Sequence, residues 1–206
     1  MKTILAFGDS LTWGSCPFTA GRHPKEDRWP EAMAAGLPGV QVITEGLRGR
    51  TTAYFRPGVA EYRGDLHLPT LLHTHAPLDL VMIMLGTNDI YSNMPMHHIW
   101  WGLRRLVEIV RTHPFGHPDH KTPEVLLIAP PTFTGGKFLG IDDAMAAESR
   151  KIGAMVAELA QEFDVPFFDA ATVAHAEAGD GLHLEAHVSR ALGEAMQAPV
   201  RTLLDL

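Results

Sequence analysis

Two segments far apart in the sequence carry the residue types that activate a nucleophile. Asp180 and His183 stand three positions apart in the segment DGLH. The carboxylate can therefore bind one imidazole nitrogen and leave the other free to act as a base. Ser10 lies in the block GDSLTWG, which follows an apolar stretch. A serine becomes a strong nucleophile only when such a base takes its proton. The alternative is that the Ser10 hydroxyl only caps a helix.

Acyl transfer also needs hydrogen-bond donors for the negative charge that develops on the substrate carbonyl oxygen. The candidates are the backbone N–H groups of Ser10 and Gly49 and the side-chain amide of Asn88. Two alternatives stay open. Gly46 could take the place of Gly49, and Asn88 could be a turn residue that bonds its own backbone.

The elements that must position these residues alternate along the chain. Apolar runs typical of buried parallel strands occur at 3–7, 40–45, 78–85, 124–130 and 165–169. Helical patterns lie between and after them, at 27–37, 68–76, 99–112, 142–163 and 184–204. This order predicts an α/β fold with a parallel sheet covered by helices on both faces.

The segments that contain the candidate catalytic residues follow the predicted strands. GDSLTWG comes after the first strand, EGLRGRTT after the second, GTND after the third, and GDGLHLE shortly after the fifth. In open parallel sheets, ligands bind at the carboxyl ends of the strands. We therefore expect these four segments to meet at one edge of the sheet.

The ordered blocks GDSLTWG, GLRGRTT, GTND and DGLH resemble those of the GDSL or SGNH hydrolases, a superfamily of serine esterases and lipases. The segments APLDLVMIMLGTND and VPFFDA are similar to those of a branch of arylesterases and acyltransferases with perhydrolase-like activity. The similarity runs from Ile4 to about His187.

The resemblance implies a flavodoxin-like three-layer α/β/α sandwich with five parallel strands in the order 2-1-3-4-5. It implies Ser10 as nucleophile, His183 as base and Asp180 as its orienting carboxylate. It also implies Gly49 and Asn88 as oxyanion donors beside the Ser10 amide. The branch carries an aromatic residue where this chain has Ser15, so we expect a more open or more polar lip of the acyl pocket.

Side chains near the serine and in the loop 130–142 are expected to shape the substrate pocket. These are Asp9, Leu11, Thr12, Trp13 and Phe133.

The chain of 206 residues, 46% hydrophobic and 20% charged, is expected to form a single domain spanning 1–206. Its net charge of −7 and lack of a basic stripe argue against nucleic acid as a partner. The sequence shows no signal-peptide core and no apolar run long enough to cross a membrane. One cysteine, Cys16, cannot form an internal disulfide. We expect a cytoplasmic protein.

The chain has 12 histidines, and His183 and His187 have a spacing found in zinc sites. The glutamate that the zinc-hydrolase motif requires after the first histidine is missing, so we expect His187 at the surface or beside the site. We predict no metal and no cofactor.

Trp100 and Trp101 are adjacent on a predicted helix and cannot both face one core. At least one of them is expected to meet another subunit or a neighbouring loop, and the segment 58–69 is long enough to help pair subunits. The resemblance implies homo-oligomers, octamers included. The small-molecule partners are expected to be esters and alcohols.

The expected function is a serine esterase for short acyl and aryl esters that works through an acyl-enzyme, with acyl transfer to alcohols or peroxide. The alternatives are a carbohydrate acetylesterase and, in a different class, a non-catalytic binding module on the same fold.

Overall fold

The five apolar runs form one sheet of five parallel strands. In this computed structural model, which describes residues 1–56, 59–115, 121–135 and 140–206, the strand order is β2-β1-β3-β4-β5. The predicted order is therefore confirmed. The strands are β1 (Lys2–Gly8), β2 (Val40–Gly46), β3 (Leu80–Met84), β4 (Glu124–Ala129) and β5 (Phe167–Asp169).

Helices connect the strands. They are α1 (Ser10–Trp13), α2 (Trp29–Ala35), α3 (Gly64–His75), α4 (Thr87–Tyr91), α5 (Met96–Thr112), α6 (Asp143–Ser149), α7 (Ile152–Phe163) and α8 (Ala186–Leu204). Short 3-10 helices are η1 (Lys25–Asp27), η2 (Ala60–Tyr62) and η3 (Ala170–Thr172).

The helical pattern at 142–163 folds as two helices, α6 and α7, rather than one. Ser149 ends the first of them, and its hydroxyl donates to the carbonyl of Ala146 at 2.8 Å. The same hydroxyl accepts the N–H of Phe133 at 2.9 Å. A serine that bonds the preceding turn and a neighbouring loop competes with continuation of the helix, which explains the break.

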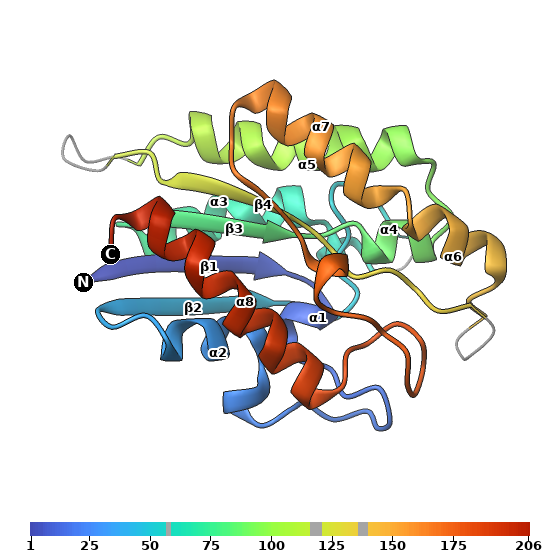
Figure 1. Cartoon of the computed structure of the whole chain (residues 1–206). Helices are drawn as coiled ribbons and strands as arrows, with labels where there is room; N and C mark the ends of the chain where they lie inside the picture. Colours follow the sequence, from blue (N-terminus) through green and yellow to red (C-terminus); the bar gives the residue numbers. More distant parts are fainter. Residues whose placement is uncertain (57–58, 116–120, 136–139) are drawn as a thin grey trace.

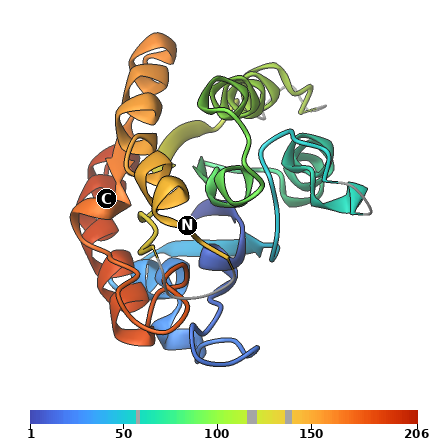
Figure 2. The same cartoon turned by 90° about the vertical axis from the view of Figure 1, so that its right-hand side faces the viewer.

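The sheet is covered on both faces, which is why its strands are apolar throughout. Leu5 and Phe7 of β1 pack in one core with residues of α3, α5 and α7. Ile4 and Ala6 point to the other face and pack with α2 and α8. Figures 1 and 2 show these helices on opposite sides of the sheet, so the three-layer α/β/α arrangement is confirmed.

All five strands point toward the same edge of the sheet. α1 and α4 begin at this edge, directly after β1 and β3, while both chain termini lie at the opposite edge (Figure 1). The predicted convergence of the motif segments at one sheet edge follows from this arrangement.

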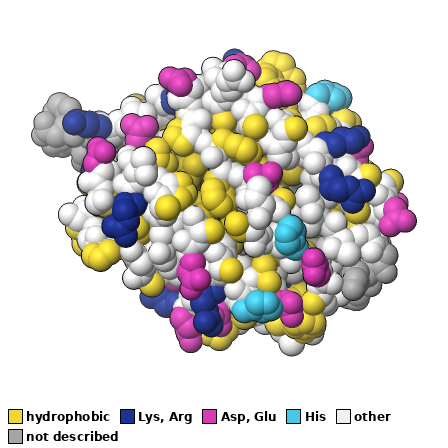
Figure 3. All heavy atoms as spheres, in the orientation of Figure 1, with side chains coloured by type: hydrophobic (Ala, Val, Ile, Leu, Met, Phe, Trp, Pro, Cys, Tyr) yellow, Lys and Arg dark blue, Asp and Glu magenta, His cyan; other side chains and the backbone are white. Residues whose placement is uncertain are grey.

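The surface carries charges of both signs. Figure 3 shows acidic and basic side chains interspersed on one face, without a band of a single sign. In the part of the chain that the structure describes, no helix has the length and apolar character needed to cross a membrane.

The two adjacent tryptophans of α5 differ in burial. Trp101 is 58% exposed, whereas Trp100 packs partly against the core. Within 58–69, residue 58 lies outside the described residues, and the remainder forms η2 and the start of α3. Pairing of subunits through these elements stays a prediction.

Candidate active site

Ser10 is the first residue of α1, immediately beyond β1. Asp9 precedes the helix, and its Oδ1 accepts the N–H of Leu11 at 2.9 Å. Gly8 allows the helix to start this close to the sheet, because a Cβ there would lie 2.0 Å from Thr12 Oγ1. As a first-turn residue, Ser10 has a backbone N–H without an intrahelical partner.

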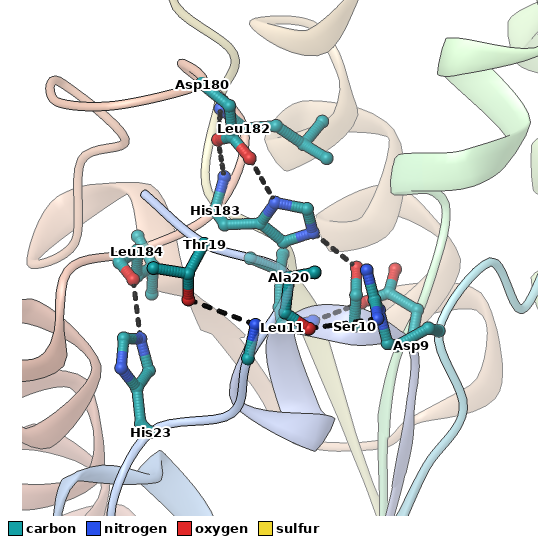
Figure 4. A network of polar contacts seen from close by, with 12 residues as sticks. Asp9, Ser10, Leu11, Thr19, Ala20, His23, Asp180, Leu182, His183 and Leu184 are labelled. Atoms are coloured by element: carbon teal, nitrogen blue, oxygen red, sulfur yellow. Dashed lines mark hydrogen bonds and ion pairs between the residues drawn. The ribbon is translucent and has the colours of Figure 1, made fainter. Parts of the chain in front are cut away.

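The His183 ring lies between Ser10 and Asp180 (Figure 4). Its Nε2 is 2.9 Å from Ser10 Oγ, and its Nδ1 is 2.5 Å from Asp180 Oδ2. Residues 173 positions apart in the sequence are thus within hydrogen-bond distance. This places the three groups in the order hydroxyl, imidazole, carboxylate.

Asp180 also holds the turn that carries the histidine. Its Oδ1 accepts the backbone N–H groups of Leu182 at 3.0 Å and His183 at 2.8 Å. Burial acts to raise the Asp180 pKa, but the hydrogen bonds and charge of His183 outweigh it, so this pKa lies below its ordinary value. The carboxylate therefore stays ionised at neutral pH and favours a proton on the adjacent Nδ1.

Asn88 lies in the first turn of α4, after β3. Its Nδ2 donates to the carbonyl oxygen of Arg50 at 3.0 Å and, over a longer 3.3 Å, to Asp9 Oδ2. The amide thereby joins the segments that follow β1, β2 and β3. Asn88 therefore does not act as a turn residue that bonds its own backbone, because both acceptors of its amide belong to distant segments.

Arg50 is a buried cation that binds backbone carbonyls at the ends of β1 and β2. One guanidinium nitrogen donates to the carbonyls of Gly8, at 2.8 Å, and Glu45, and the group lies 4.2 Å from the centroid of the Phe7 ring. Burial, opposed by the charges of Glu45 and Asp9, lowers the Arg50 pKa to about 10. The residue remains charged at neutral pH and anchors the loop that supplies the Asn88 acceptor.

Gly49 and Gly46 have different surroundings. Gly49 has a φ of +85°, and a Cβ there would lie 2.7 Å from the Tyr62 ring. Its N–H has no hydrogen-bond partner among the described residues, so it can bind a ligand oxygen. Gly46 ends β2, where a Cβ would lie 2.2 Å from the backbone nitrogen of Trp13. Gly46 therefore serves the packing of α1 on β2.

Two further carboxyls lie buried behind the site. Burial raises the pKa of Asp9 from 3.8 to about 6, although the N–H of Leu11 and the charge of His183 oppose the rise. Burial raises the pKa of Asp89 to about 6 as well. Asp89 accepts the hydroxyl of Thr52 at 2.7 Å and its backbone N–H at 3.0 Å, and so ties α4 to the loop after β2.

A cavity of about 580 Å³ opens beside the His183 ring. Its walls come from the loop after α1, the loop after β2 and the turn before α8. The lining residues are Ser15, Cys16, Pro17, Phe18, Thr19, Ala20, Arg48, Gly179, Asp180 and His183. Ser15, expected at the lip of the pocket, lines this cavity but is only 4% exposed.

The structure does not bring the expected pocket side chains to this cavity. Leu11 packs in the core beneath α2 and α8, and Phe133 packs in the core on the other face of the sheet. Thr12 is fully buried against Gly8. Asp9 is fully buried, and its Oδ2 is 3.3 Å from Asn88 Nδ2. Trp13 is half-buried beside Arg22 and Arg48. None of the five lines this cavity, and their part in a substrate pocket stays a prediction.

Comparison with known proteins agrees with this geometry. The family model described as GDSL-like lipase/acylhydrolase matches residues 6–191. The chain belongs to this family.

The chain is similar to known proteins over different lengths. An arylesterase of Vibrio mimicus is 31% identical over 114 residues, which span 53% of this chain and 49% of that relative. The match thus spans about half of the curated relative. A solved carbohydrate acetylesterase family member from Sinorhizobium meliloti is 39% identical, with a TM-score of 0.93 and 100% of both chains covered. A solved aryl esterase of M. smegmatis is 36% identical, with a TM-score of 0.93, and covers 99% of this chain and 100% of its own.

The sequence of this GDSL-family chain did not predict the contacts of Arg50 and Asp89 or the cavity lining at 16–20, although Ser15 was expected near the pocket. Arg50 and Asp89 stand inside the quoted blocks GLRGRTT and GTND, so a charged residue directly beside a predicted site residue was the available signal. No comparable pattern marks 16–20, whose position depends on how the loop folds back.

Some of the described histidine rings lie in pairs, His73 with His113 and His97 with His98. His187 is exposed on α8, as expected for a surface residue. Within the described ranges, no group of three or more His, Cys, Asp or Glu side chains is arranged to hold a metal ion.

Proposed function

We propose that this protein is a serine esterase that hydrolyses short acyl and aryl esters through an acyl-enzyme. One observation carries the proposal: the continuous hydrogen-bonded series from Ser10 Oγ through His183 to Asp180. Membership of the GDSL-like family and the similarity to an arylesterase and an aryl esterase support it.

In the first half-reaction, Ser10 Oγ attacks the ester carbonyl while its proton passes to His183 Nε2. The carboxylate of Asp180 stabilises the imidazolium that forms, because its lowered pKa keeps it ionised. Nε2 then returns the proton to the departing alcohol as the carbonyl is restored. Water, activated by the same nitrogen, hydrolyses the acyl-enzyme.

The oxyanion is stabilised by the backbone N–H groups of Ser10 and Gly49 and by the Asn88 amide. The backbone carbonyl oxygen of Arg50 accepts one Asn88 N–H, with Nδ2 and the oxygen 3.0 Å apart, while the longer contact of 3.3 Å to Asp9 leaves the other N–H weakly held. The two N–H groups share one rigid plane, and we assign this weakly held second N–H to the developing charge. Such donors each contribute about 10²- to 10³-fold in rate.

Transfer to an alcohol or to peroxide competes with hydrolysis at the acyl-enzyme. The cavity beside His183 has apolar walls at Pro17, Phe18 and Ala20, which favour an organic alcohol over water. The alcohol or peroxide that attacks the acyl-enzyme gives its proton to His183 Nε2 and takes the acyl group from Ser10. An alcohol therefore yields an ester, and hydrogen peroxide yields a peracid.

A second candidate activity is deacetylation of a carbohydrate. The full-length similarity to a carbohydrate acetylesterase family member favours it. Both activities use the same residues, so relative rates on acetylated xylose and phenyl acetate decide between them.

The test of the proposal is labelling and turnover of a Ser10→Ala variant beside a Ser92→Ala control. Ser92 follows α4 and has no described side-chain hydrogen bond. We expect a fluorophosphonate to label the parent and the control but not Ser10→Ala, with ester turnover falling by at least about 10³-fold. Equal labelling of all three proteins would show that the reactive residue is not Ser10 and would overturn the proposal. An unlabelled and inactive parent would favour a non-catalytic binding module instead.

A further inference from the structure

One wall of the cavity beside His183 carries an arginine without an acidic partner. Arg48 lines the cavity together with His183, and its guanidinium lies 5.2 Å from the centroid of the Trp13 ring. Arg22 stacks on the same indole at 5.0 Å. Among the described residues, neither guanidinium has a carboxylate within 4.0 Å.

The indole and one carbonyl hold the Arg48 guanidinium in place without neutralising it. One terminal nitrogen donates to the carbonyl of Ala20 at 3.3 Å. A guanidinium has five N–H donors in a planar fork, so most of them remain available. This fork matches a carboxylate, which accepts two parallel hydrogen bonds.

Other groups of the cavity favour an aromatic or apolar body attached to that carboxylate. Phe18 is 63% exposed at the cavity, and Pro17 and Ala20 add apolar surface. Burial and the charge of Arg28 both lower the pKa of Arg22, so further positive charge lies on this side of the molecule. Arg48 thus places a positive charge at a cavity whose one lining carboxylate, Asp180, is already bound by His183.

The position of the cavity indicates which half of an ester it receives. His183 and Asp180 line it, whereas Ser10 and the candidate oxyanion donor Asn88 do not. The alcohol half of an ester departs next to the imidazole that protonates it. The cavity thus suits the leaving group.

We propose that Arg48 selects esters whose leaving alcohol or phenol carries a carboxylate. The inference rests on the proposed esterase function and names its substrate class. In such a substrate, the carboxylate binds the Arg48 fork, the ring lies against Phe18, and the ester oxygen lies beside His183 Nε2.

The experiment compares two acetate esters that differ in one charge, 4-acetoxybenzoate and methyl 4-acetoxybenzoate. The release of each phenol gives kcat/KM, and the ratio of the anionic to the neutral ester is taken for each protein. Comparing this ratio among variants cancels the different chemical reactivity of the two phenols. We expect Arg48→Gln to lower the ratio about three- to tenfold, and Arg48→Lys to lower it less.

Two further arms make the comparison specific. Arg105→Gln removes the same charge from an exposed position of α5, outside the cavity lining, and should leave the ratio at its parent value. Raising the salt concentration to about 0.5 M should lower the parent ratio but have little effect on Arg48→Gln. A second ester pair, phenyl hydrogen succinate and phenyl methyl succinate, carries the charge on the acyl half and should not respond to Arg48.

The outcomes separate the two proposals. A ratio unaffected by Arg48→Gln in an enzyme that hydrolyses both acetates would overturn the role of Arg48 and leave the esterase function intact. An Arg48 effect confined to the succinate pair would also overturn it. A folded parent protein that hydrolyses none of the four esters would remove both proposals.

Discussion

Replacing Asp180 by Asn tests whether the carboxylate sets the protonation of the histidine. In Asp180→Asn, the side-chain oxygen can keep the two backbone hydrogen bonds at 2.8 and 3.0 Å, while an NH₂ group replaces the oxygen 2.5 Å from His183 Nδ1. Two donors cannot face each other. The ring proton must therefore move to Nε2, which then points a donor at Ser10 and cannot take its proton.

The expected loss follows from this change of tautomer. We expect kcat/KM for phenyl acetate to fall about 10⁴-fold, or about 5 kcal/mol of transition-state stabilisation. The free energy of unfolding should change much less, because the turn keeps its acceptor. In Asp180→Ala, the same activity is lost, but two backbone N–H groups also lose their acceptor, which costs about 2 to 4 kcal/mol of stability.

Steady-state kinetics and urea unfolding of both variants provide the comparison. Asp164→Asn is a matched control, because Asp164 ends α7 in the left-handed conformation that Asn tolerates. An Asp180→Asn enzyme that keeps a tenth or more of the parent kcat/KM would refute the reasoning, since the tautomer would then not depend on this carboxylate.

Three other predictions concern the oxyanion donors and a buried carboxyl. Asn88→Ala should lower kcat about 10²- to 10³-fold with a smaller change in KM, and a loss below tenfold in steady-state assays would contradict its donor role. For Asp89, the folded pKa of about 6 exceeds the ordinary 3.8, so the folded chain binds more protons and its free energy of unfolding falls as the pH rises between these values. Asp89→Asn removes this titration. Its free energy of unfolding, measured in urea, should therefore rise relative to that of the parent by up to about 3 kcal/mol between about pH 4 and about pH 7. Parallel pH curves for the two proteins would argue against a buried charge. Gly49→Ala places a Cβ 2.7 Å from the Tyr62 ring at a φ of +85°. It should lower the free energy of unfolding by about 2 kcal/mol and should also lower kcat. An unchanged melting temperature would show that the loop adapts.

Much of the fold was predictable because its signals are local. The strand at 3–7 is apolar on both faces, and the structure covers both faces of β1 with helices. Helix boundaries were less predictable where a side chain from another element intervenes. The break after Ser149 depends on its bond to Phe133, which no sequence period records.

Some residues of the candidate site were likewise predictable from local sequence, and others were not. Ser10, Asn88 and His183 were predictable because each follows a strand end or lies in a dense polar block. Phe133 was expected in the pocket and lies in the core instead, since the loop composition does not tell which way an aromatic side chain turns.

The sequence by itself determined the alternation of strands and helices, the parallel sheet, and the residue types available at its carboxyl edge, because hydrophobic periodicity and turn residues act over a few neighbours. Only the tertiary structure decided that the Asn88 amide binds the Arg50 carbonyl, and that Arg48 and the segment 15–20 form a cavity beside His183. These contacts join segments distant in sequence, and their geometry follows from the packing of whole elements against one another.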